Sequence, residues 1–326
     1  MSGDRGLPAR LAQNLRFDGL WWRQFAYLGC VYGPEWWKRY SPPAIGAIIF
    51  TLVGRNRRGA IANFERVLAP AGRGEAARAA LRMFANFACC FTETMEFYGP
   101  RPRPIRVDPP IVNPIAAALT AGRGVVILTA HFGNWDIAAK TLGAYGRPIN
   151  IVMARESNVT TQEYLRRARE QTGVRVIYSD TSVFSSLNMI RALRQNEIVA
   201  LQLDRVTGKT RAIPFFGAPA AFPAGPFILA RLAGTPLIPV FIPRVGTRHY
   251  AIRLGQPLSV PRERGETAAL DHAMRSVVAE FEQVVREFPT QWFQFLPFWP
   301  PSAAGDVTAI PTEQGDRLGE PRRMRR

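Results

Sequence analysis

The stretch VVILTAHFGNWD, residues 125–136, decides the fold that this sequence predicts. Its first six residues, Val125 to Ala130, form a continuous apolar run, which is typical of a strand buried on both faces of a parallel sheet. A helical pattern follows from about Asp136 to Gly143. The residues between strand and helix therefore lie in the kind of turn where open α/β sheets build their sites.

The same alternation of apolar run and helix continues along the chain. Further buried strands are predicted at Ile149 to Ala154, Val174 to Tyr178, Ile198 to Leu203 and Leu237 to Ile242. Further helices are predicted near Thr161 to Gln171, Ser182 to Arg194, Gly225 to Leu232 and Glu266 to Glu287, with a hairpin across Val245-Gly246-Thr247. This spacing indicates βαβ units and an α/β fold with a mostly parallel central sheet flanked by helices.

Composition limits the function classes. A chain of 326 residues with 47% hydrophobic content can bury one large core or two modest ones. Its net charge of +17 predicts an anionic partner, which could be nucleic acid, a membrane surface or an acidic carrier. The three cysteines, Cys30, Cys89 and Cys90, have no metal-ligand spacing, so a reducing compartment is expected and no metal site is predicted.

The first hundred residues have a different character. Four tryptophans lie among basic residues, and an apolar stretch from Ala44 to Val53 is about half the length that a membrane span needs. The tryptophans are Trp21, Trp22, Trp36 and Trp37. An in-plane interfacial helix and an aromatic-rich helix packed on the core both fit this pattern. No signal peptide is expected at the start. We divide the chain into a helical, membrane-associating region (1–100), an α/β domain (101–300) and a basic, disordered tail (301–326).

His131 is the first candidate for a catalytic base. An imidazole can take a proton at neutral pH, and a carboxylate on its far nitrogen fixes the tautomer. Asp136, five positions on, is the carboxylate expected to do so. The structural alternative is a buried histidine that caps the turn. Charged residues also follow two other predicted strands, Arg155 after the second and Asp204-Arg205 after the fourth. Because the carboxyl ends of parallel strands share one edge, these side chains are expected in one crevice, although each could be a solvated loop charge.

The sequence lacks the residues required for a phosphate-binding loop, a dinucleotide-binding fingerprint or the nucleophile elbow of a serine hydrolase. Gly208-Lys209-Thr210 resembles the end of a phosphate-binding loop, but position 203, where the first glycine is needed, is Leu203. A dinucleotide fingerprint starting at Gly122 fails at Ile127, and no G-x-S-x-G elbow occurs. A non-enzymatic basic protein that binds nucleic acid or membrane is the remaining alternative.

The motif HFGNWD resembles the His-x4-Asp/Glu motif of the bacterial lipid A biosynthesis acyltransferase family, which includes phosphatidylinositol mannoside acyltransferases and is similar to lysophospholipid acyltransferases. Four further blocks resemble the family in the same order, and the resemblance covers roughly residues 10–300. They are RNRRGAIANFERVLAP (55–70), FANFACCFTETMEFYG (84–99), ARESNVTTQEYLRRAREQTG (154–173) and LDRVTGKTRAIPFFGAPAAFPAGPFILARLAGTPLIPVF (203–241). Aspartate at position 136, where the lipid A branch usually has glutamate, is nearer the mannoside-type branch.

The resemblance implies a glycerolipid acyltransferase-like fold. It also implies transfer of a fatty acyl chain from an acyl carrier protein or coenzyme A thioester to a glycolipid or phospholipid hydroxyl, at the cytoplasmic face of the inner membrane. No cofactor besides the donor and no nucleic acid partner are expected.

The resemblance assigns roles residue by residue. His131 is similar to the family's base, Asp136 to its orienting acid, and Asp204 to the acidic residue that assists from the far strand. Arg169, before Gly173, matches the supporting arginine, with Arg166 and Arg167 as alternative registers.

Two expectations concern the bound substrate. Arg169, Arg155 or the backbone N–H groups of Gly133 and Asn134 are expected to stabilise the oxyanion. Arg205 is expected to bind substrate, and Phe215, Phe216 and Gly217 to form a wall of the acyl groove, unless that loop simply packs on the core.

Overall fold

A computed structural model of the chain describes residues 27–100, 102–110, 112–153, 173–179, 183–206, 208–261 and 266–299. Arg155, Arg166, Arg167, Arg169, the predicted helix at 161–171, Trp21, Trp22 and the predicted tail therefore lie outside the described residues.

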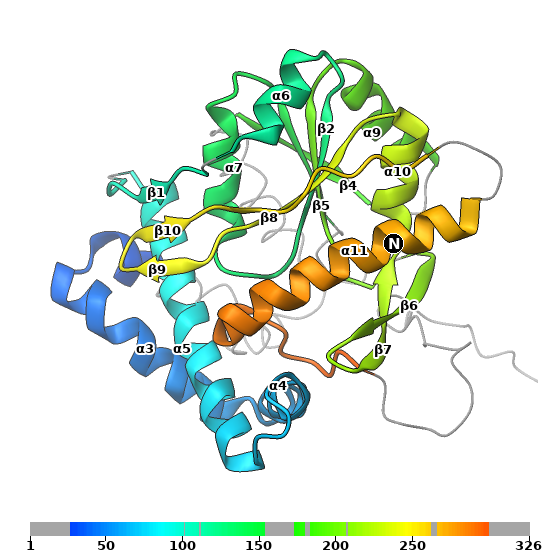
Figure 1. Ribbon diagram of the computed structural model, residues 1–326. Coiled ribbons are helices and arrows are strands. Elements are labelled where there is room, and N and C mark those ends of the chain that lie inside the picture. Colours follow the sequence, from blue (N-terminus) through cyan, green and yellow to red (C-terminus); the bar gives the residue numbers. More distant parts are fainter. Residues whose placement is uncertain are drawn as a thin grey trace, which may run out of the picture.

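The central sheet is six-stranded, with the order β11-β8-β2-β5-β3-β4 (Figure 1). Its five longer strands are parallel, and they end within one residue of the predicted runs. They are β2 (Val125–Thr129), β3 (Ile149–Met153), β4 (Val174–Tyr178), β5 (Ile198–Gln202) and β8 (Leu237–Phe241). The short β11 (Arg253–Leu254) pairs antiparallel to β8 at one edge. The predicted mostly parallel sheet is confirmed.

Helices flank this sheet. Figure 1 shows α11 (Glu266–Glu287) running across the sheet, with α9 (Val183–Arg194) and α10 (Gly225–Ala233) beside it, while α7 (Trp135–Gly143) follows β2. The short α6 (Pro114–Thr120) precedes β2. Asn134 caps α7, because its side-chain oxygen accepts a hydrogen bond from the Ile137 N–H. The bounds of α11 are those that the hydrophobic periodicity predicted.

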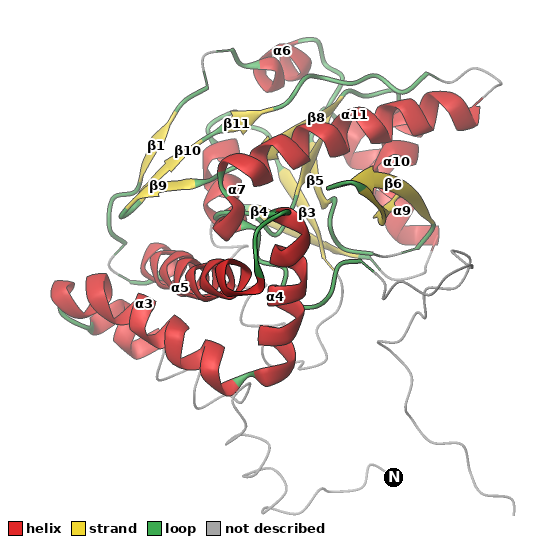
Figure 2. Cartoon of the chain, turned by 60° about the horizontal axis from the view of Figure 1, so that its bottom comes forward, coloured by secondary structure: helices red, strands yellow, loops and turns green. Residues whose placement is uncertain are grey.

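The described part of the N-terminal region is helical: residues 27–32 are helical, and α3 (Glu35–Leu52), α4 (Gly54–Val67) and α5 (Arg73–Tyr98) follow. Figure 2 shows them grouped below the sheet. The helix α3 crosses α5 closely at Gly46, where a β-carbon would lie 2.5 Å from the carbonyl oxygen of Phe84. The predicted apolar stretch at residues 44–53 thus lies mainly in α3, and no helix among the described residues is long and apolar enough to cross a bilayer.

Two smaller sheets complete the fold. One joins β1 (Arg106–Asp108), β10 (His249–Ala251) and β9 (Arg244–Gly246), and the other is a hairpin of β6 (Thr210–Phe215) and β7 (Ala218–Pro223). The predicted hairpin is divided between two sheets, because β9 pairs with β10 while Leu254 of β11 pairs with Val240 of β8. A 3-10 turn, η1 (Pro289–Gln291), follows α11.

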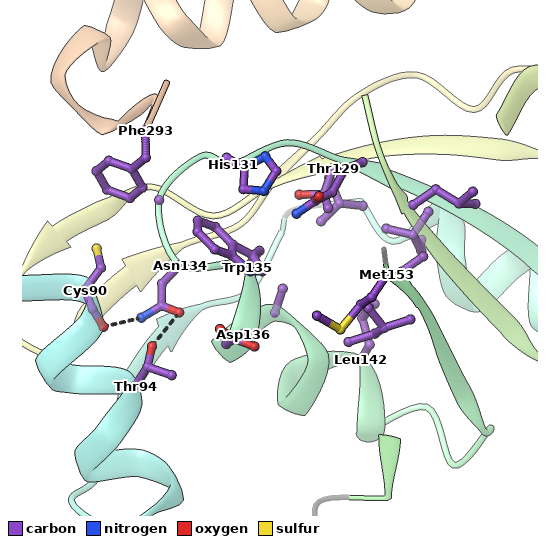
Figure 3. Close-up of a pocket in the computed structure, with 18 of the residues that line it drawn as sticks. Cys90, Thr94, Thr129, His131, Asn134, Trp135, Asp136, Leu142, Met153 and Phe293 are labelled. Carbon is purple, nitrogen blue, oxygen red and sulfur yellow. Dashed lines mark hydrogen bonds between the residues drawn. The ribbon is translucent and has the colours of Figure 1, made fainter. Parts of the chain in front are cut away.

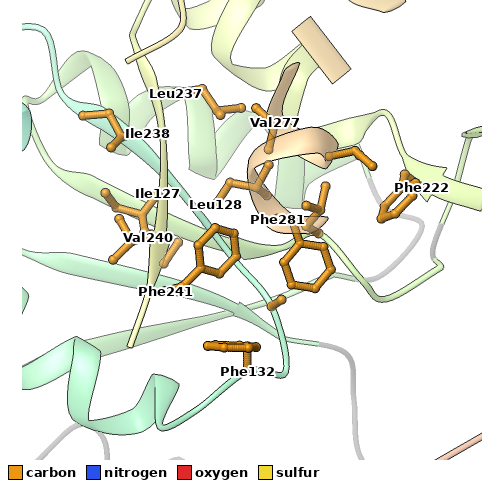
Figure 4. Close-up of a cluster of buried hydrophobic side chains, with 14 of the residues drawn as sticks. Ile127, Leu128, Phe132, Phe222, Leu237, Ile238, Val240, Phe241, Val277 and Phe281 are labelled. Carbon is orange, nitrogen blue, oxygen red and sulfur yellow. The ribbon is translucent and has the colours of Figure 1, made fainter. Parts of the chain in front are cut away.

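The core between α11 and the sheet combines aliphatic side chains with phenylalanine rings (Figure 4). Phe281 of α11 stacks on Phe241 of β8, with ring centroids 5.3 Å apart, and on Phe215 of β6, at 5.4 Å. All three side chains are fully buried. This cluster anchors α11 and the segment after it beside the end of β8.

Candidate functional site

A pocket of about 340 Å³ opens where the parallel strands end. The helices α5 and α7 line it together with β2, β3, β5 and the end of β8, and most of the lining is apolar. Figure 3 shows His131 above this space, with Leu142 and Met153 further along it. The apolar lining residues include Ile127, Ala138, Leu142, Ile149, Ile151 and Val240.

The register of the sheet brings His131 and Asp204 together. Thr129 of β2 pairs with Gln202 of β5, and His131 and Asp204 each follow two residues later. Nδ1 of His131 lies 3.0 Å from Oδ1 of Asp204. The backbone N–H of His131 also donates to this carboxylate, at 3.1 and 3.0 Å from its two oxygens. The expected convergence of these two residues is confirmed.

The two partners differ in exposure. The Asp204 side chain is 1% exposed and that of His131 is 29% exposed. Burial raises the pKa of Asp204, but the charge of His131 and hydrogen bonds from His131 and Trp292 outweigh burial and hold it below its ordinary value. Asp204 is therefore a buried anion that faces an imidazole at the pocket edge.

Backbone hydrogen bonds fix the turn that carries His131. The N–H of Gly133 donates to the Gln291 carbonyl at 2.9 Å, and the N–H of Asn134 donates to the Ile242 carbonyl at 3.0 Å. Gly133 has φ +58°, and a β-carbon there would overlap the Ile242 carbonyl oxygen. The expectation that these two N–H groups stabilise an oxyanion is wrong for this geometry, because both already have acceptors.

The Asn134 side chain anchors the turn to α5 and β10. Its amide donates to the Cys90 carbonyl at 3.2 Å and to the Tyr250 hydroxyl at 3.1 Å. Its oxygen accepts from the Thr94 hydroxyl at 3.1 Å, as Figure 3 shows, and from the helix N-terminus. Asn134 is buried and makes all four hydrogen bonds that an amide can make, so its role is to hold the turn.

A buried ion pair supports this anchor. The Tyr250 hydroxyl donates to Glu93 of α5, and Glu93 also accepts from Arg244 at 3.0 and 2.8 Å. Burial of Arg244 opposes its charge, but the hydrogen bonds to Glu93 and the negative charge of that carboxylate raise the pKa of this guanidinium. The pKa of Tyr250 is raised by burial and by Cys90 and Glu93. Tyr250 is therefore a neutral donor between the ion pair and Asn134.

Comparison with known proteins identifies the family of this chain. The profile of the bacterial lipid A biosynthesis acyltransferases matches residues 13–300. The chain belongs to this family. Curated relatives include phosphatidylinositol mannoside acyltransferases from two strains of Mycobacterium tuberculosis, 28% identical over 185 residues and 29% identical over 187. Each alignment covers 56% of this chain and 57% of the relative. A protein of the same name from Mycolicibacterium smegmatis is 26% identical over 64% of this chain and 65% of its own length. The chain thus spans a little more than half the length of the first relatives.

Within this family member, the contact predicted for Asp136 is made by another residue. The carboxylate at Nδ1 of His131 belongs to Asp204, so the contact with this nitrogen that was expected from Asp136 is made by Asp204. The reason is the sheet register, which places Asp204 level with the histidine. Asp136 lies in the first turn of α7 and lines the same pocket, so a different part in catalysis stays a prediction.

The remaining predicted residues separate into two groups. Arg205 is exposed and lines the pocket, so its predicted substrate contact stays a prediction, as do those of Arg155 and Arg169 outside the described residues. The predicted acyl wall at Phe215, Phe216 and Gly217 is wrong for this pocket. Phe215 is fully buried against α11, and Phe216 and Gly217 form the turn of the β6–β7 hairpin. Phe215 and Phe216 therefore pack in the hydrophobic core.

Sequence reasoning missed the segment Gln291 to Phe293. Nε1 of Trp292 donates to Oδ2 of Asp204 at 3.0 Å, and the N–H of Phe293 donates to the His131 carbonyl at 2.7 Å. The ring of Phe293 lines the pocket. The aromatic run QWFQFLPFW after the long helix was the available signal. It has neither helical nor strand periodicity, so periodicity gave it no role.

Proposed function

We propose that this protein is a membrane-associated O-acyltransferase, which moves a fatty acyl chain from an acyl carrier protein or coenzyme A thioester to a hydroxyl of a glycolipid or phospholipid. The observation that carries the proposal is the His131–Asp204 pair at the edge of an apolar pocket of about 340 Å³. A base beside an apolar space suits a reaction between a hydroxyl and an acyl chain.

The proposed chemistry needs one base and no covalent enzyme intermediate. With Nδ1 directed at Asp204, Nε2 of His131 takes the proton as the acceptor oxygen bonds to the thioester carbonyl carbon. The buried carboxylate stabilises the imidazolium that forms. The tetrahedral intermediate then loses the carbon–sulfur bond, and the leaving thiolate takes the proton from the imidazolium. The products are an ester and a free thiol.

The negative charge on the tetrahedral oxygen needs hydrogen-bond donors other than the backbone N–H groups of Gly133 and Asn134, which already have acceptors. The proposed donors are Arg205 at the pocket, Arg155 from its place after the second predicted strand, and Arg169 by family resemblance. Their guanidinium groups can give two hydrogen bonds to one oxygen or phosphate. Asp136 lies in the pocket lining, and we assign it a contact with the acceptor rather than with the imidazole.

A lipid acceptor requires access to a membrane surface, and α3 offers a matching face. Trp36, Tyr40, Ile48 and Leu52 recur at multiples of four residues along the outer side of the helix, and each is 56–66% exposed. The guanidinium of Arg39 lies 5.6 Å from the Tyr40 ring centroid. Aromatic and apolar side chains beside a cation suit insertion at the headgroup boundary. This face supports the interfacial alternative for α3 over a helix wholly packed on the core.

The acceptor proposed is a mannoside-type glycolipid. Aspartate at position 136 and the names of the three curated relatives support this class. We assign the cytoplasmic face of the inner membrane as the place of the reaction, because the chain belongs to a family of lipid-modifying acyltransferases. His131 lines the pocket, and the buried carboxylate of Asp204 faces its Nδ1. The non-enzymatic alternative does not explain this pair.

Thiol release and lipid mass spectrometry test the proposal. Purified protein is mixed with vesicles that contain acceptor lipid and a thioester donor, and the new ester is identified by mass. His131→Ala is compared with His272→Ala, which changes an exposed histidine on α11. Loss of transfer in the first variant alone supports the proposal. Binding of DNA with no acyl transfer from either donor class would favour the non-enzymatic alternative.

A further inference from the structure

Trp292 lies outside every motif that points to the reaction, yet it contacts the acidic member of the pair. Its indole is 2% exposed, and Nε1 donates to Oδ2 of Asp204 at 3.0 Å. Its neighbours bind the same turn, since Gly133 donates to the Gln291 carbonyl and Phe293 donates to the His131 carbonyl. Phe132 and Trp292 also form an isolated antiparallel bridge.

We propose that Trp292 is a positioning residue for the reaction, which sets the plane of the Asp204 carboxylate and through it the orientation of His131. This inference rests on the proposed function, in which His131 is the base and Asp204 its partner.

The division of hydrogen bonds on the carboxylate gives the physical reason. Oδ1 faces Nδ1 of His131, while Oδ2 accepts from Trp292 on the other side. The backbone N–H of His131 lies between the two oxygens, so it does not by itself fix the rotation of the carboxylate. Without the indole donor, the buried and charged Oδ2 would lose the hydrogen bond from residue 292. The carboxylate would then be free to rotate away from the His131 imidazole.

The indole itself has little freedom. The rings of Phe215, Phe281 and Phe298 meet it edge to face, with centroids 5.5, 5.9 and 5.0 Å away. Because packing holds the indole in one orientation, its N–H group loses little entropy on forming the hydrogen bond, and it fixes the position of the Asp204 oxygen that accepts it. Among the described residues, the titratable side chain in contact with Asp204 is His131.

The same aromatic cluster supplies a matched control. Trp299 is 8% exposed and its ring centroid lies 6.0 Å from that of Trp292. Its Nε1 is buried without a hydrogen-bond acceptor among the described residues. Trp299→Phe therefore removes an indole from the same cluster without removing a hydrogen bond, whereas Trp292→Phe removes both.

The experiment compares Trp292→Phe with Trp299→Phe in the full chain, with kcat, KM and melting temperature measured for each. We expect kcat to fall about 10-fold or more in Trp292→Phe with KM within about threefold, and to change by less than about threefold in Trp299→Phe. Melting temperatures should fall in both, because both lose buried ring area. Equal losses of kcat in the two variants would overturn the inference.

A double variant separates positioning from general support. If Trp292 acts through Asp204, then Trp292→Phe should cost little more kcat in an Asp204→Asn background, whereas a general structural role predicts the same loss in both backgrounds. Should Trp292→Phe fail to fold, benzothienylalanine at position 292 keeps the ring shape and removes the N–H, and wild-type kcat in that protein would overturn the inference. Activity in His131→Ala would instead refute the proposed function. An inactive His131→Ala with unaffected Trp292 variants would refute this inference alone.

Discussion

Replacing Asp204 with asparagine tests the central geometry of the site. The side chain keeps its shape but loses its charge, and one of its two terminal atoms becomes an N–H donor. In the protein both oxygens face donors: Oδ1 faces Nδ1 of His131, and Oδ2 faces Nε1 of Trp292, each at 3.0 Å. The amide nitrogen of the substituted side chain must therefore face one of these two nitrogens.

Either orientation of that amide is harmful. Facing the indole, it leaves two buried donors pointing at each other, which costs about 1–3 kcal/mol of folding free energy. Facing the imidazole, it stabilises the tautomer with the proton on Nε2, which cannot accept the proton of the acceptor hydroxyl. In other enzymes this change in a histidine–aspartate pair lowers kcat by about 10⁴. We expect kcat of Asp204→Asn to fall by about 10³ to 10⁴, with KM within about threefold.

Release of free thiol from the donor, measured under saturating acceptor, gives kcat directly. Asp136→Asn is the matched comparison, because the two variants replace the two acidic candidates for orienting His131 by the same isostere. Asp136→Asn should lose less kcat than Asp204→Asn. If Asp204→Asn kept more than a tenth of wild-type kcat, or if Asp136→Asn were the more damaged variant, the assignment of Asp204 as the orienting acid would be refuted.

The same variant carries a prediction for pH. The pKa of Asp204 in the folded protein is held below its ordinary value of 3.8. A lowered folded pKa means that the ionised group stabilises the fold above pH 3.8 and that this contribution disappears as the pH falls through the folded value. The difference in free energy of unfolding between wild type and Asp204→Asn should therefore be largest near neutral pH and shrink below about pH 4. Denaturant unfolding at several pH values measures it.

Three further changes test other parts of the site. His131→Ala should lower kcat by at least about 10²-fold because the base is lost, and its melting temperature should fall because the buried Asp204 loses the hydrogen bond from Nδ1; a folded variant with a change in KM alone would contradict the base assignment. Gly133→Ala should cost about 3 kcal/mol or more of stability, since its φ is positive and the β-carbon would overlap the Ile242 carbonyl; wild-type melting would contradict this. Ile48→Glu with Leu52→Glu should weaken sedimentation with anionic vesicles, and detergent should release the wild type better than salt. Leu187→Glu, on the exposed face of α9, is the control that should still bind.

Apolar runs and helical patterns predicted the elements well because burial in the structure follows them. Residues 125–129 and 198–202 form mostly buried strands. The predicted runs end one residue later because Ala130 and Leu203 are also buried, beyond the paired region. The meeting of Asp204 with His131 followed from a topological rule, since both lie past the carboxyl ends of parallel strands. These features depend on local pattern and on one general property of α/β sheets.

Contacts made by irregular segments had no such signal. Trp292 follows a 3-10 turn, and its bond to Asp204 spans 88 positions. Glu93 and Tyr250 are separated by 157 positions and meet only because α5 lies against the β9–β10 hairpin. The aromatic residues 215 and 216 were misinterpreted for the related reason that an apolar loop gives the same composition whether it lines a pocket or fills the core. Three-dimensional packing decides between those outcomes.

Several residues of the motif HFGNWD therefore have a structural role, and few are candidates for the reaction. Phe132 is fully buried, Gly133 is required by the backbone conformation, and Asn134 commits its side chain to four structural hydrogen bonds. Within the motif, His131 forms the hydrogen bond to the buried Asp204 carboxylate, and Asp136 lines the pocket. A turn held by β8, α5, β10 and the segment after α11 has little freedom to shift when substrate binds. Such a turn presents the imidazole in one orientation, which is the condition that general base catalysis places on its protein scaffold.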